Sequence, residues 1–410
     1  MKNEDESTRS HKKIILQYGK NLLKSKKKSK SSKHAKLRTD AEEFIRSKGY
    51  RAETHTVNTI DGYVLTIHRI VPMSNLKRMH DFRKSSKQRV ILHHGLLGSS
   101  DDWLLLGPEY ALPYLLSDQG YDVWLLNARG NKYAREHRSN FMTSNNFWKF
   151  SWHEMGKYDL PAVIKYISKS AYKADTYFIG HSMGATALLV LLSTRPEYNR
   201  KIKSAILLAP LAFMYNVKGP LKRLTEFHSH VNISTLIDDN EFLTDGAFAQ
   251  ILNEDFCEGL VKTCSDTLLL MSDGGKEIFD ANLRRTILHR KPAGTSTRTI
   301  LHYMQLIKSG FFRRFDYGKI NNVKRYFLEE PPNYELEKIT VPISLISSES
   351  DWLAREPDIT TLVTKLASVK VHHVIRNSNF DHMDFIWSKR SLRLVFEPVL
   401  DILRRAIKGK

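Results

Sequence analysis

Residues Tyr177–Ser193 read YFIGHSMGATALLVLLS, and this stretch decides the fold. A short apolar run, Tyr177–Ile179, leads into GHSMG at 180–184 and then into a helical pattern at Ala185–Ser193. A serine on so sharp a strand-to-helix turn adopts strained dihedral angles, and flanking glycines let the backbone and the helix approach closely. Gly-x-Ser-x-Gly is weak alone, but this position predicts Ser182 as a nucleophile. The alternative is an ordinary glycine-bounded turn.

Short apolar runs bounded by turn residues recur on both sides of this stretch. Such runs are typical of strands buried on both faces, as in a parallel sheet. Helical patterns lie between them, and this alternation predicts an α/β fold with a mostly parallel sheet. The expected strands are Val90–His93, Val123–Leu126, Tyr177–Ile179, Ala205–Leu208, Ile343–Ile346 and Val371–Ile375, and the expected helices are Tyr110–Leu116, Asp159–Ile167, Ala185–Ser193 and Ser391–Ile407.

The alternation is preceded by a hairpin and interrupted by an insertion. Asp61-Gly62 joins the β-runs Arg51–Thr59 and Tyr63–Arg69 and is a strong hairpin signal. From about Phe213 to Thr340 the pattern is helical and loop-like, and an insertion of this length between two strands predicts a separate cap. The predicted organisation is a basic tail at 1–38, a core at 39–212 and 341–410, and a cap at 213–340.

A nucleophilic serine needs a base, and the base needs a carboxylate that orients it. Asp351 follows the strand Ile343–Ile346, and His382 follows the next strand, at the end where functional groups gather. These positions predict His382 as the base and Asp351 as the acid. The rival acids are Glu349, Asp381 and Asp384; we prefer Asp351 to the last two because residues next to the histidine rarely aim their side chains at it.

The loop His94–Gly98 follows the strand Val90–His93. Its backbone N–H groups, together with that of Met183 at the start of the helix after Ser182, are candidates for an oxyanion hole. A tight turn before a helix is the structural alternative.

Composition excludes several classes of protein. Of the residues, 41% are hydrophobic and 26% charged, within the range of globular proteins. Two cysteines in 410 residues exclude a disulfide scaffold and a four-thiolate zinc site. No apolar run approaches the roughly 18 residues of a transmembrane helix.

The net charge of +20 is concentrated at the N-terminus. Residues 1–38 hold 13 Lys or Arg against three acidic residues, half of the net charge. A disordered, solvated tail is the favoured interpretation. The stretch Lys24–Lys36 also fits a nuclear-localisation or nucleic-acid patch, but it lacks the interleaved aromatic residues that stack on bases, so no nucleic-acid partner is expected. A third alternative is a short basic helix on an anionic membrane, with Ile15, Tyr18, Leu22 and Leu23 on its apolar face.

Several further segments carry a family resemblance. From about Thr39 to its end, the sequence resembles the acid lipase family of α/β-hydrolases, which includes gastric and lysosomal acid lipases and their insect relatives. The segments are TIDGYVLTIHRI at 59–70, HHGLLGSSDDW at 93–103, NARGNKYAREH at 127–137, FWKFSWHEMGKYDLPAVI at 147–164, GHSMG at 180–184, SESDWLA at 348–354 and DHMDFIW at 381–387.

The resemblance implies a role for individual residues. Ser182 would be the nucleophile, His382 the base and Asp351 the orienting acid, while Leu96 and Met183 would supply the oxyanion-hole amides. It also implies an α/β-hydrolase fold with a helical cap, beneath which triacylglycerols or cholesteryl esters are hydrolysed. Arg129 is interpreted as a structural hydrogen-bonding hub rather than a catalyst.

The sequence departs from the family in three places. Asp381 stands where relatives commonly have asparagine, which adds a negative charge beside the base. The basic tail replaces the usual signal peptide. Cys257 and Cys264 resemble the family's disulfide pair but are closer in sequence; in a helix they would lie roughly 10 Å apart, too far for a bridge, whereas Gly259 permits a non-helical loop.

The predicted function is a serine lipase that works through an acyl-enzyme, without a metal or organic cofactor. Its expected partner is a lipid ester at a membrane, micelle or droplet surface. The alternatives are a short-chain carboxylesterase, an α/β-hydrolase peptidase or a non-catalytic lipid-binding protein. The resemblance favours secretion or the lysosome, and Asn232-Ile233-Ser234 fits an N-glycosylation site, but no signal peptide is visible, so the compartment stays open.

Overall fold

The computed structural model describes residues 40–72, 88–169, 174–230, 239–242, 283, 287 and 293–409. The predictions for the tail at 1–38, for Asn232 and for Cys257 and Cys264 lie outside the described residues. In the described part, no helix is both long enough and apolar enough to span a bilayer.

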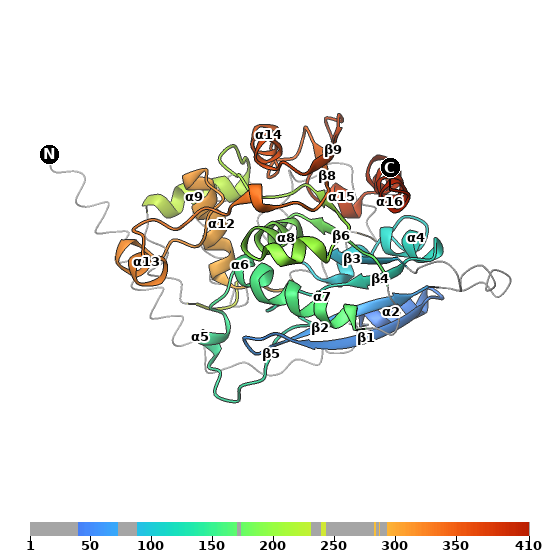
Figure 1. Ribbon diagram of the computed structural model, residues 1–410, viewed down its shortest axis with the longest axis horizontal. Coiled ribbons are helices and arrows are strands. Elements are labelled where there is room, and N and C mark those ends of the chain that lie inside the picture. The colour runs from blue at the N-terminus through green and yellow to red at the C-terminus, as the bar shows by residue number, and fades with distance from the viewer. Residues whose placement is uncertain are drawn as a thin grey trace. The chain divides into compact units, whose positions relative to one another are not determined.

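The described strands form one nine-stranded sheet in the order β1-β2-β4-β3-β6-β7-β8-β9, with β5 paired to β2 (Figure 1). The neighbours from β4 to β9 run parallel, whereas β2 is antiparallel to β1, β4 and β5. The α/β fold with a mostly parallel sheet is therefore confirmed. The strands are β1 (Arg51–Asn58), β2 (Tyr63–Val71), β3 (Arg89–His93), β4 (Asp122–Leu125), β5 (Glu136–His137), β6 (Thr176–His181), β7 (Ser204–Leu208), β8 (Ile343–Ser348) and β9 (Val369–Ile375).

The predicted hairpin is also confirmed. β1 pairs with β2 from Arg51 opposite Val71 to Asn58 opposite Val64. Gly62 takes a left-handed φ of 96°, and its N–H donates to the carbonyl of Thr59 at 3.1 Å. Glycine is suited to this turn because it carries no Cβ.

Helices cover both faces of the sheet (Figure 1). The chain leaves β3 through α4 (Leu112–Asp118) to reach β4, then reverses direction through α7 (Leu160–Ser168) to reach β6 on the other side of β3. Because crossovers between parallel strands are right-handed, the reversal puts α4 on one face and α7 on the other. The later crossover helices α8 (Met183–Thr194) and α14 (Glu356–Lys365) connect strands that are added on the same side of β3 as β6.

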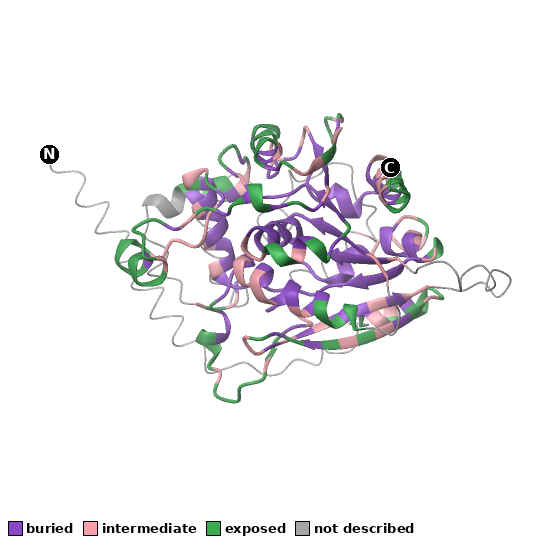
Figure 2. Ribbon diagram, in the orientation of Figure 1, coloured by how far each residue is buried: buried purple, intermediate pink, exposed green. Residues whose placement is uncertain are grey.

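The core centres on the middle strands and on α8. Every residue of β3, β6, β7 and β8 is buried, and α8 is buried from Met183 to Ser193 (Figure 2). A helix that is apolar on every side is typical of a protein interior. The rigid centre of the molecule therefore lies directly beneath Ser182.

Three predicted helices differ from the structure in bounds or in helix type, each near a proline. The first helix begins at Leu112 rather than Tyr110, because Pro113 is tolerated only within the first turn. The predicted helix at 159–167 is α7, preceded by a π-helical segment, η3 (Met155–Asp159). The last helix covers the predicted residues 391–407, with the π-helical η8 (Leu392–Phe396) passing without a break into α16 (Glu397–Ile407). Pro161 and Pro398 lack the N–H that a continuous α-helix requires.

The described part of the insertion between β7 and β8 is helical. It contains α9 (Pro220–His230), α12 (Thr297–Ser309), α13 (Lys319–Tyr326) and the short η7 (Leu336–Lys338). Outside the sheet, the described β-pairing consists of two isolated bridges, Glu241 with Ser296 and Arg313 with Asn333. The remaining short helical elements are α2 (Ala41–Ser47), η2 (Ser100–Trp103), α5 (Ser144–Phe147), α6 (Trp152–Glu154), η4 (Pro196–Arg200) and α15 (Asp384–Trp387).

Candidate active site

Ser182 lies on the turn between β6 and α8, with φ 53° and ψ −116°. This left-handed conformation is rare for a residue with a side chain and persists only where the surroundings hold it. A Cβ on Gly180 would lie 2.7 Å from the backbone nitrogen of Ala185, and one on Gly184 would lie 2.4 Å from the carbonyl oxygen of His93. Both positions therefore require glycine, and the predicted strand–turn–helix is confirmed.

The structure brings Ser182, His382 and Asp351 into one chain of hydrogen bonds. The Ser182 hydroxyl lies 2.8 Å from Nε2 of His382, and Nδ1 of the same ring lies 2.8 Å from Oδ2 of Asp351. The carboxylate only accepts, so Nδ1 carries the proton and Nε2 is free to accept from the serine. All three side chains are buried. This geometry can activate a hydroxyl for nucleophilic attack.

The second oxygen of Asp351 fixes the carboxylate in place. Oδ1 accepts from the backbone N–H groups of Leu353 at 2.8 Å and Ala354 at 2.9 Å. The two candidate acids beside His382 accept hydrogen bonds from the backbone. Oδ1 of Asp381 accepts from the N–H groups of Met383 and Asp384. Oδ2 of Asp384 accepts from the N–H of Asp381. Of the four candidate acids, Asp351 is the one whose oxygen meets the imidazole.

Three residues that the sequence analysis missed hold the loop that carries His382. Nε2–H of His181, next to Ser182, donates to the carbonyl oxygen of His382 at 3.0 Å. The Ser348 hydroxyl donates to the carbonyl of Phe380 at 2.6 Å, and that of Ser350 donates to the carbonyl of Asn377. His181 is the second residue of GHSMG, and that motif was a signal for the first contact. Ser348 and Ser350 give no such signal until the strands are placed.

The loop at 94–98 lies against Ser182. A Cβ on Gly95 would lie 3.2 Å from the Cβ of Ser182. His94 braces the loop, because its Nδ1–H donates to the carbonyl of Gly95 at 2.7 Å and its Nε2 accepts from the N–H of Ala128 at 3.0 Å. Leu96 and Met183 are both buried. Their role as oxyanion-hole donors stays a prediction.

Arg129 is a buried hub, as interpreted from the sequence. Its guanidinium donates to both oxygens of Asp159 and to both oxygens of Asp61, and it stacks 3.9 Å from the ring centroid of Tyr63. These contacts join the β1–β2 turn to the start of α7. They leave Arg129 no part in the Ser182–His382–Asp351 chain.

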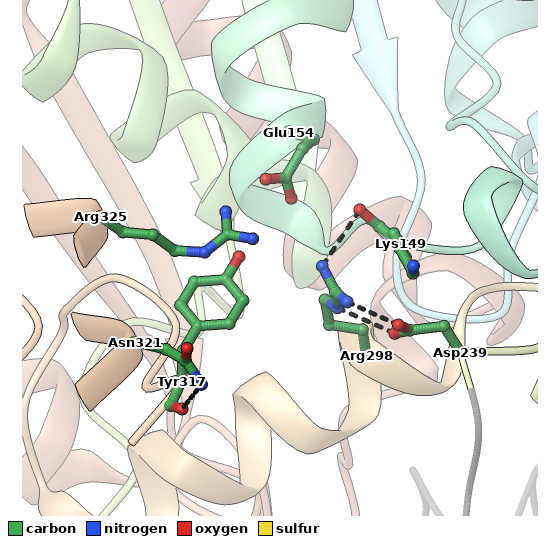
Figure 3. Close-up of a pocket in the computed structure, with 7 residues that line it drawn as sticks. All are labelled: Lys149, Glu154, Asp239, Arg298, Tyr317, Asn321 and Arg325. Atoms are coloured by element: carbon green, nitrogen blue, oxygen red, sulfur yellow. Dashed lines mark hydrogen bonds and ion pairs between the residues drawn. The ribbon is translucent and has the colours of Figure 1, made fainter. Parts of the chain in front are cut away.

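A polar hollow of about 430 Å³ lies elsewhere, between α6, α12 and α13 (Figure 3). Arg298 is held there by two hydrogen bonds to Asp239, at 3.0 and 2.7 Å. Its lining residues are Lys149, Glu154, Asp239, Arg298, Tyr317, Asn321 and Arg325, none of which belongs to the hydrogen-bonded chain of Ser182. Among the described residues, no cluster of His, Cys, Asp or Glu is arranged to hold a metal ion.

The chain matches two family profiles and a set of known lipases. A profile described as a partial alpha/beta-hydrolase lipase region matches residues 41–107, and one described as the alpha/beta hydrolase fold matches residues 88–234. Lipase 3 of Drosophila melanogaster is 37% identical, over 88% of this chain and 92% of its own. The chain belongs to the acid lipase family of α/β-hydrolases.

Vertebrate members of the family are similar over the same length. Gastric triacylglycerol lipase of Bos taurus is 33% identical over 91% of this lipase and 93% of its own chain. Lysosomal acid lipase/cholesteryl ester hydrolase of Homo sapiens is 32% identical over 88% and 90%. Lipases are carboxylic ester hydrolases, and this lipase is therefore a hydrolase of lipid esters.

Solved structures agree on the fold. The Acinetobacter baumannii protein lip1 superposes with a TM-score of 0.51 at 13% identity and covers 92% of this lipase and 100% of its own chain. A bacterial membrane phospholipase A has a TM-score of 0.50 at 15% identity, with 88% of each chain covered. At these identities the likeness shows the α/β-hydrolase fold alone.

Proposed function

We propose that this lipase hydrolyses long-chain triacylglycerols or cholesteryl esters through an acyl-enzyme on Ser182. The observation that carries the proposal is the chain of two 2.8 Å hydrogen bonds from Ser182 through His382 to Asp351. The substrate class is supported by relatives named as a gastric triacylglycerol lipase and a lysosomal acid lipase/cholesteryl ester hydrolase.

In the first half-reaction, the Ser182 oxygen attacks the ester carbonyl while its proton passes to Nε2 of His382. Asp351 stabilises the imidazolium that results. The backbone N–H groups of Leu96 and Met183 stabilise the negative charge that develops on the carbonyl oxygen. When the tetrahedral intermediate collapses, Nε2 returns the proton to the leaving alkoxide, so a diacylglycerol or cholesterol departs and Ser182 keeps the acyl group.

In the second half-reaction, water replaces the alcohol. Nε2 of His382 accepts a proton as the water oxygen attacks the acyl carbonyl, and the fatty acid leaves when the proton returns to the Ser182 oxygen. The products are the alcohol, the fatty acid and the free Ser182 hydroxyl. The same imidazole serves as base and as acid in both halves.

Access to the site requires movement. Ser182 is 1% exposed and His382 is fully buried, so a lipid ester cannot reach the serine oxygen in this conformation. We propose the insertion at 213–340 as the cap that opens, and the basic segment at 1–38 as a further contact with anionic membranes. A closed cap also excludes water from the charges that form during the reaction.

The test compares aggregated with soluble substrate. Wild-type protein should hydrolyse emulsified triolein and cholesteryl oleate, with a rate that rises steeply once the substrate aggregates, whereas a short p-nitrophenyl ester should show plain saturation. Ser182→Ala should lose all of these activities. A preference for short esters, with equal rates on dissolved and aggregated substrate, would identify a carboxylesterase instead. Lipid binding without any turnover would identify a non-catalytic carrier.

A further inference from the structure

An apolar surface lies on α13 and its C-terminal end, away from the catalytic residues. We name it the α13 patch; it consists of Ile320, Val323, Phe327 and Leu328, whose exposed fractions are 74%, 46%, 87% and 54%. Single exposed apolar residues are ordinary, but a group of large ones marks a surface that contacts another apolar phase.

The packing of α13 is the reverse of that of an ordinary surface helix, which buries its apolar stripe. The buried residue of α13 is Asn322. Its Nδ2 donates to Oδ1 of Asp316 at 2.7 Å and to the carbonyl of Glu329 at 2.8 Å, while its Oδ1 accepts from the N–H of Tyr317 at 2.9 Å. Polar bonds therefore hold the helix to the protein, and the apolar side chains are left for another contact.

A third side of α13 faces the polar hollow. Asn321 and Arg325, one turn apart, line that hollow, and the guanidinium of Arg325 stacks 4.2 Å from the ring centroid of Tyr317 (Figure 3). Residues at i and i+4 share a helix face, so the hollow is on a different side from Ile320 and Val323. The patch is thus not part of the wall of the hollow.

Phe327 is held outward at a conformational cost. It caps α13 in the left-handed conformation, with φ 60°. Glycine or asparagine is usual at this position, because a bulky side chain is strained there. A phenylalanine that is strained and almost fully exposed is difficult to explain by the stability of the folded chain alone.

The charges on α13 indicate what covers the patch. The helix KINNVKRY carries Lys319, Lys324 and Arg325 and no acidic residue, and Glu329 and Glu330 follow Leu328, so the segment at 319–330 has a net charge of +1. Glu329 accepts from Lys319 at 3.1 Å and Glu330 accepts from Arg313 at 3.0 Å, so both acids beside the patch are paired with cations. A lipid surface accommodates both features, because apolar side chains enter the acyl boundary while long cationic side chains reach anionic headgroups.

We propose that the α13 patch is the surface by which this lipase docks on its lipid substrate. Ile320, Val323, Phe327 and Leu328 insert into the surface, and Lys324 contacts phosphate or carboxylate groups of the lipids. The proposal rests on the proposed function only in that the substrate is aggregated lipid. The binding step itself needs no catalysis.

The experiment uses the full chain with the Ser182→Ala substitution, so that docking is measured without hydrolysis. The test variant is I320S/F327S, and the matched control is I60S/F141S, which removes two residues of equal type that are 90% and 94% exposed elsewhere. Co-flotation is measured with phosphatidylcholine vesicles, with and without phosphatidylserine. Vesicles of phosphatidylcholine alone carry no net charge, so electrostatic attraction of the basic tail contributes little to binding there. We expect the test variant to bind both kinds of vesicle about tenfold or more weakly, and the control to bind like the parent.

A second measurement separates docking from catalysis. With Ser182 intact, I320S/F327S should lower the rate on emulsified triolein but leave kcat/KM for a soluble short ester and Tm unchanged. Unchanged vesicle binding by the test variant, or an equal loss in the control, would overturn the proposal. A wild-type dimer that I320S/F327S converts to a monomer would also overturn it, because the occupant would then be a second copy. If triolein is not hydrolysed at all, the proposed function fails while the vesicle result still decides the docking surface.

Discussion

Asp351 has two oxygens with different partners, and this difference determines what an amide would do there. In Asp351→Asn, the amide oxygen is needed by the N–H groups of Leu353 and Ala354. The NH₂ group then faces Nδ1 of His382 and selects the tautomer that carries its proton on Nε2. That ring cannot accept the proton of Ser182. We expect kcat to fall by about 10³–10⁴-fold with Tm nearly unchanged, as measured by ester hydrolysis and thermal unfolding.

Asp381→Asn and Glu349→Gln are the controls for this prediction. Asp381 accepts backbone N–H groups through Oδ1, and an asparagine oxygen can do the same. We therefore expect less than about a tenfold change in kcat for either variant. A larger loss from Glu349→Gln than from Asp351→Asn would show that the acid has been assigned to the wrong residue.

His181 should act on the reaction through the position of His382. Leucine at this position removes the donor to the His382 carbonyl, whereas the amide of glutamine can replace Nε2–H. We expect His181→Leu to lower kcat for a soluble ester about fivefold and His181→Gln to recover most of the loss, because one neutral hydrogen bond contributes about 1 kcal/mol. Equal rates for the two variants would exclude this positioning role.

The sequence was sufficient to predict the three central residues but not their support. Ser182, Asp351 and His382 each follow a strand, and parallel strands bring those ends to one edge of the sheet. The hydroxyls of Ser348 and Ser350 could not be assigned in the same way. Their bonds to the carbonyls of Phe380 and Asn377 depend on how the end of β8 approaches the loop after β9, which no spacing in the chain encodes.

At the scale of the element, helix propensity and close packing predict opposite effects of an alanine at position 184. It lies in the first turn of α8, where alanine would ordinarily stabilise a helix by about 1 kcal/mol relative to glycine. The added Cβ, however, would lie 2.4 Å from a backbone oxygen of β3, which cannot rotate away. We expect Gly184→Ala to lower Tm, as measured by circular dichroism. The control Gly49→Ala places a Cβ with no atom within 4 Å, so its only cost is the backbone strain of alanine at φ 85°, and it should lower Tm less. A Tm raised by Gly184→Ala would mean that α8 is not packed against β3 as described.

The sequence pattern was least informative about helices in which an amphipathic repeat, which favours one continuous α-helix, includes a proline, which lacks the N–H that such a helix needs. The pattern of Ser391–Ile407 is amphipathic throughout and favours one helix. Pro398 lacks an N–H, and the chain takes up a π-helical segment just before α16. The same conflict at Pro161 gives η3 before α7. By contrast, the predicted helix Ala185–Ser193 contains no proline. The observed helix, Met183–Thr194, agrees with it to within two residues at either end.

At the scale of the whole molecule, two buried histidines, His93 and His302, and the half-buried His153 make stability depend on pH. Burial lowers the pKa of His93 and of His153 to about 4, and it lowers the pKa of His302 well below its ordinary value. The unfolded chain takes up protons near pH 6.5. The stability from these neutral rings is therefore complete above about pH 6.5 and is lost as the pH falls through about 4.

We accordingly expect Tm to decrease by several degrees between pH 7 and pH 5. His153→Gln removes one of the titrating groups and should reduce this slope, whatever its effect on Tm at pH 7. Differential scanning calorimetry at a series of pH values measures both quantities. A Tm that stays constant or rises on acidification in the wild-type protein would contradict the neutral, buried state of these rings.

The central claim is that Ser182 is the nucleophile of the whole enzyme, and covalent labelling tests it most directly. The wild-type protein and Ser182→Ala are incubated with a fluorophosphonate, and the labelled site is located by mass spectrometry of the intact chain and of its peptides. We expect one label for each wild-type molecule, on the peptide that contains GHSMG, and no label on Ser182→Ala with an unchanged Tm. A label retained by Ser182→Ala, or found on another serine in the wild type, would contradict it.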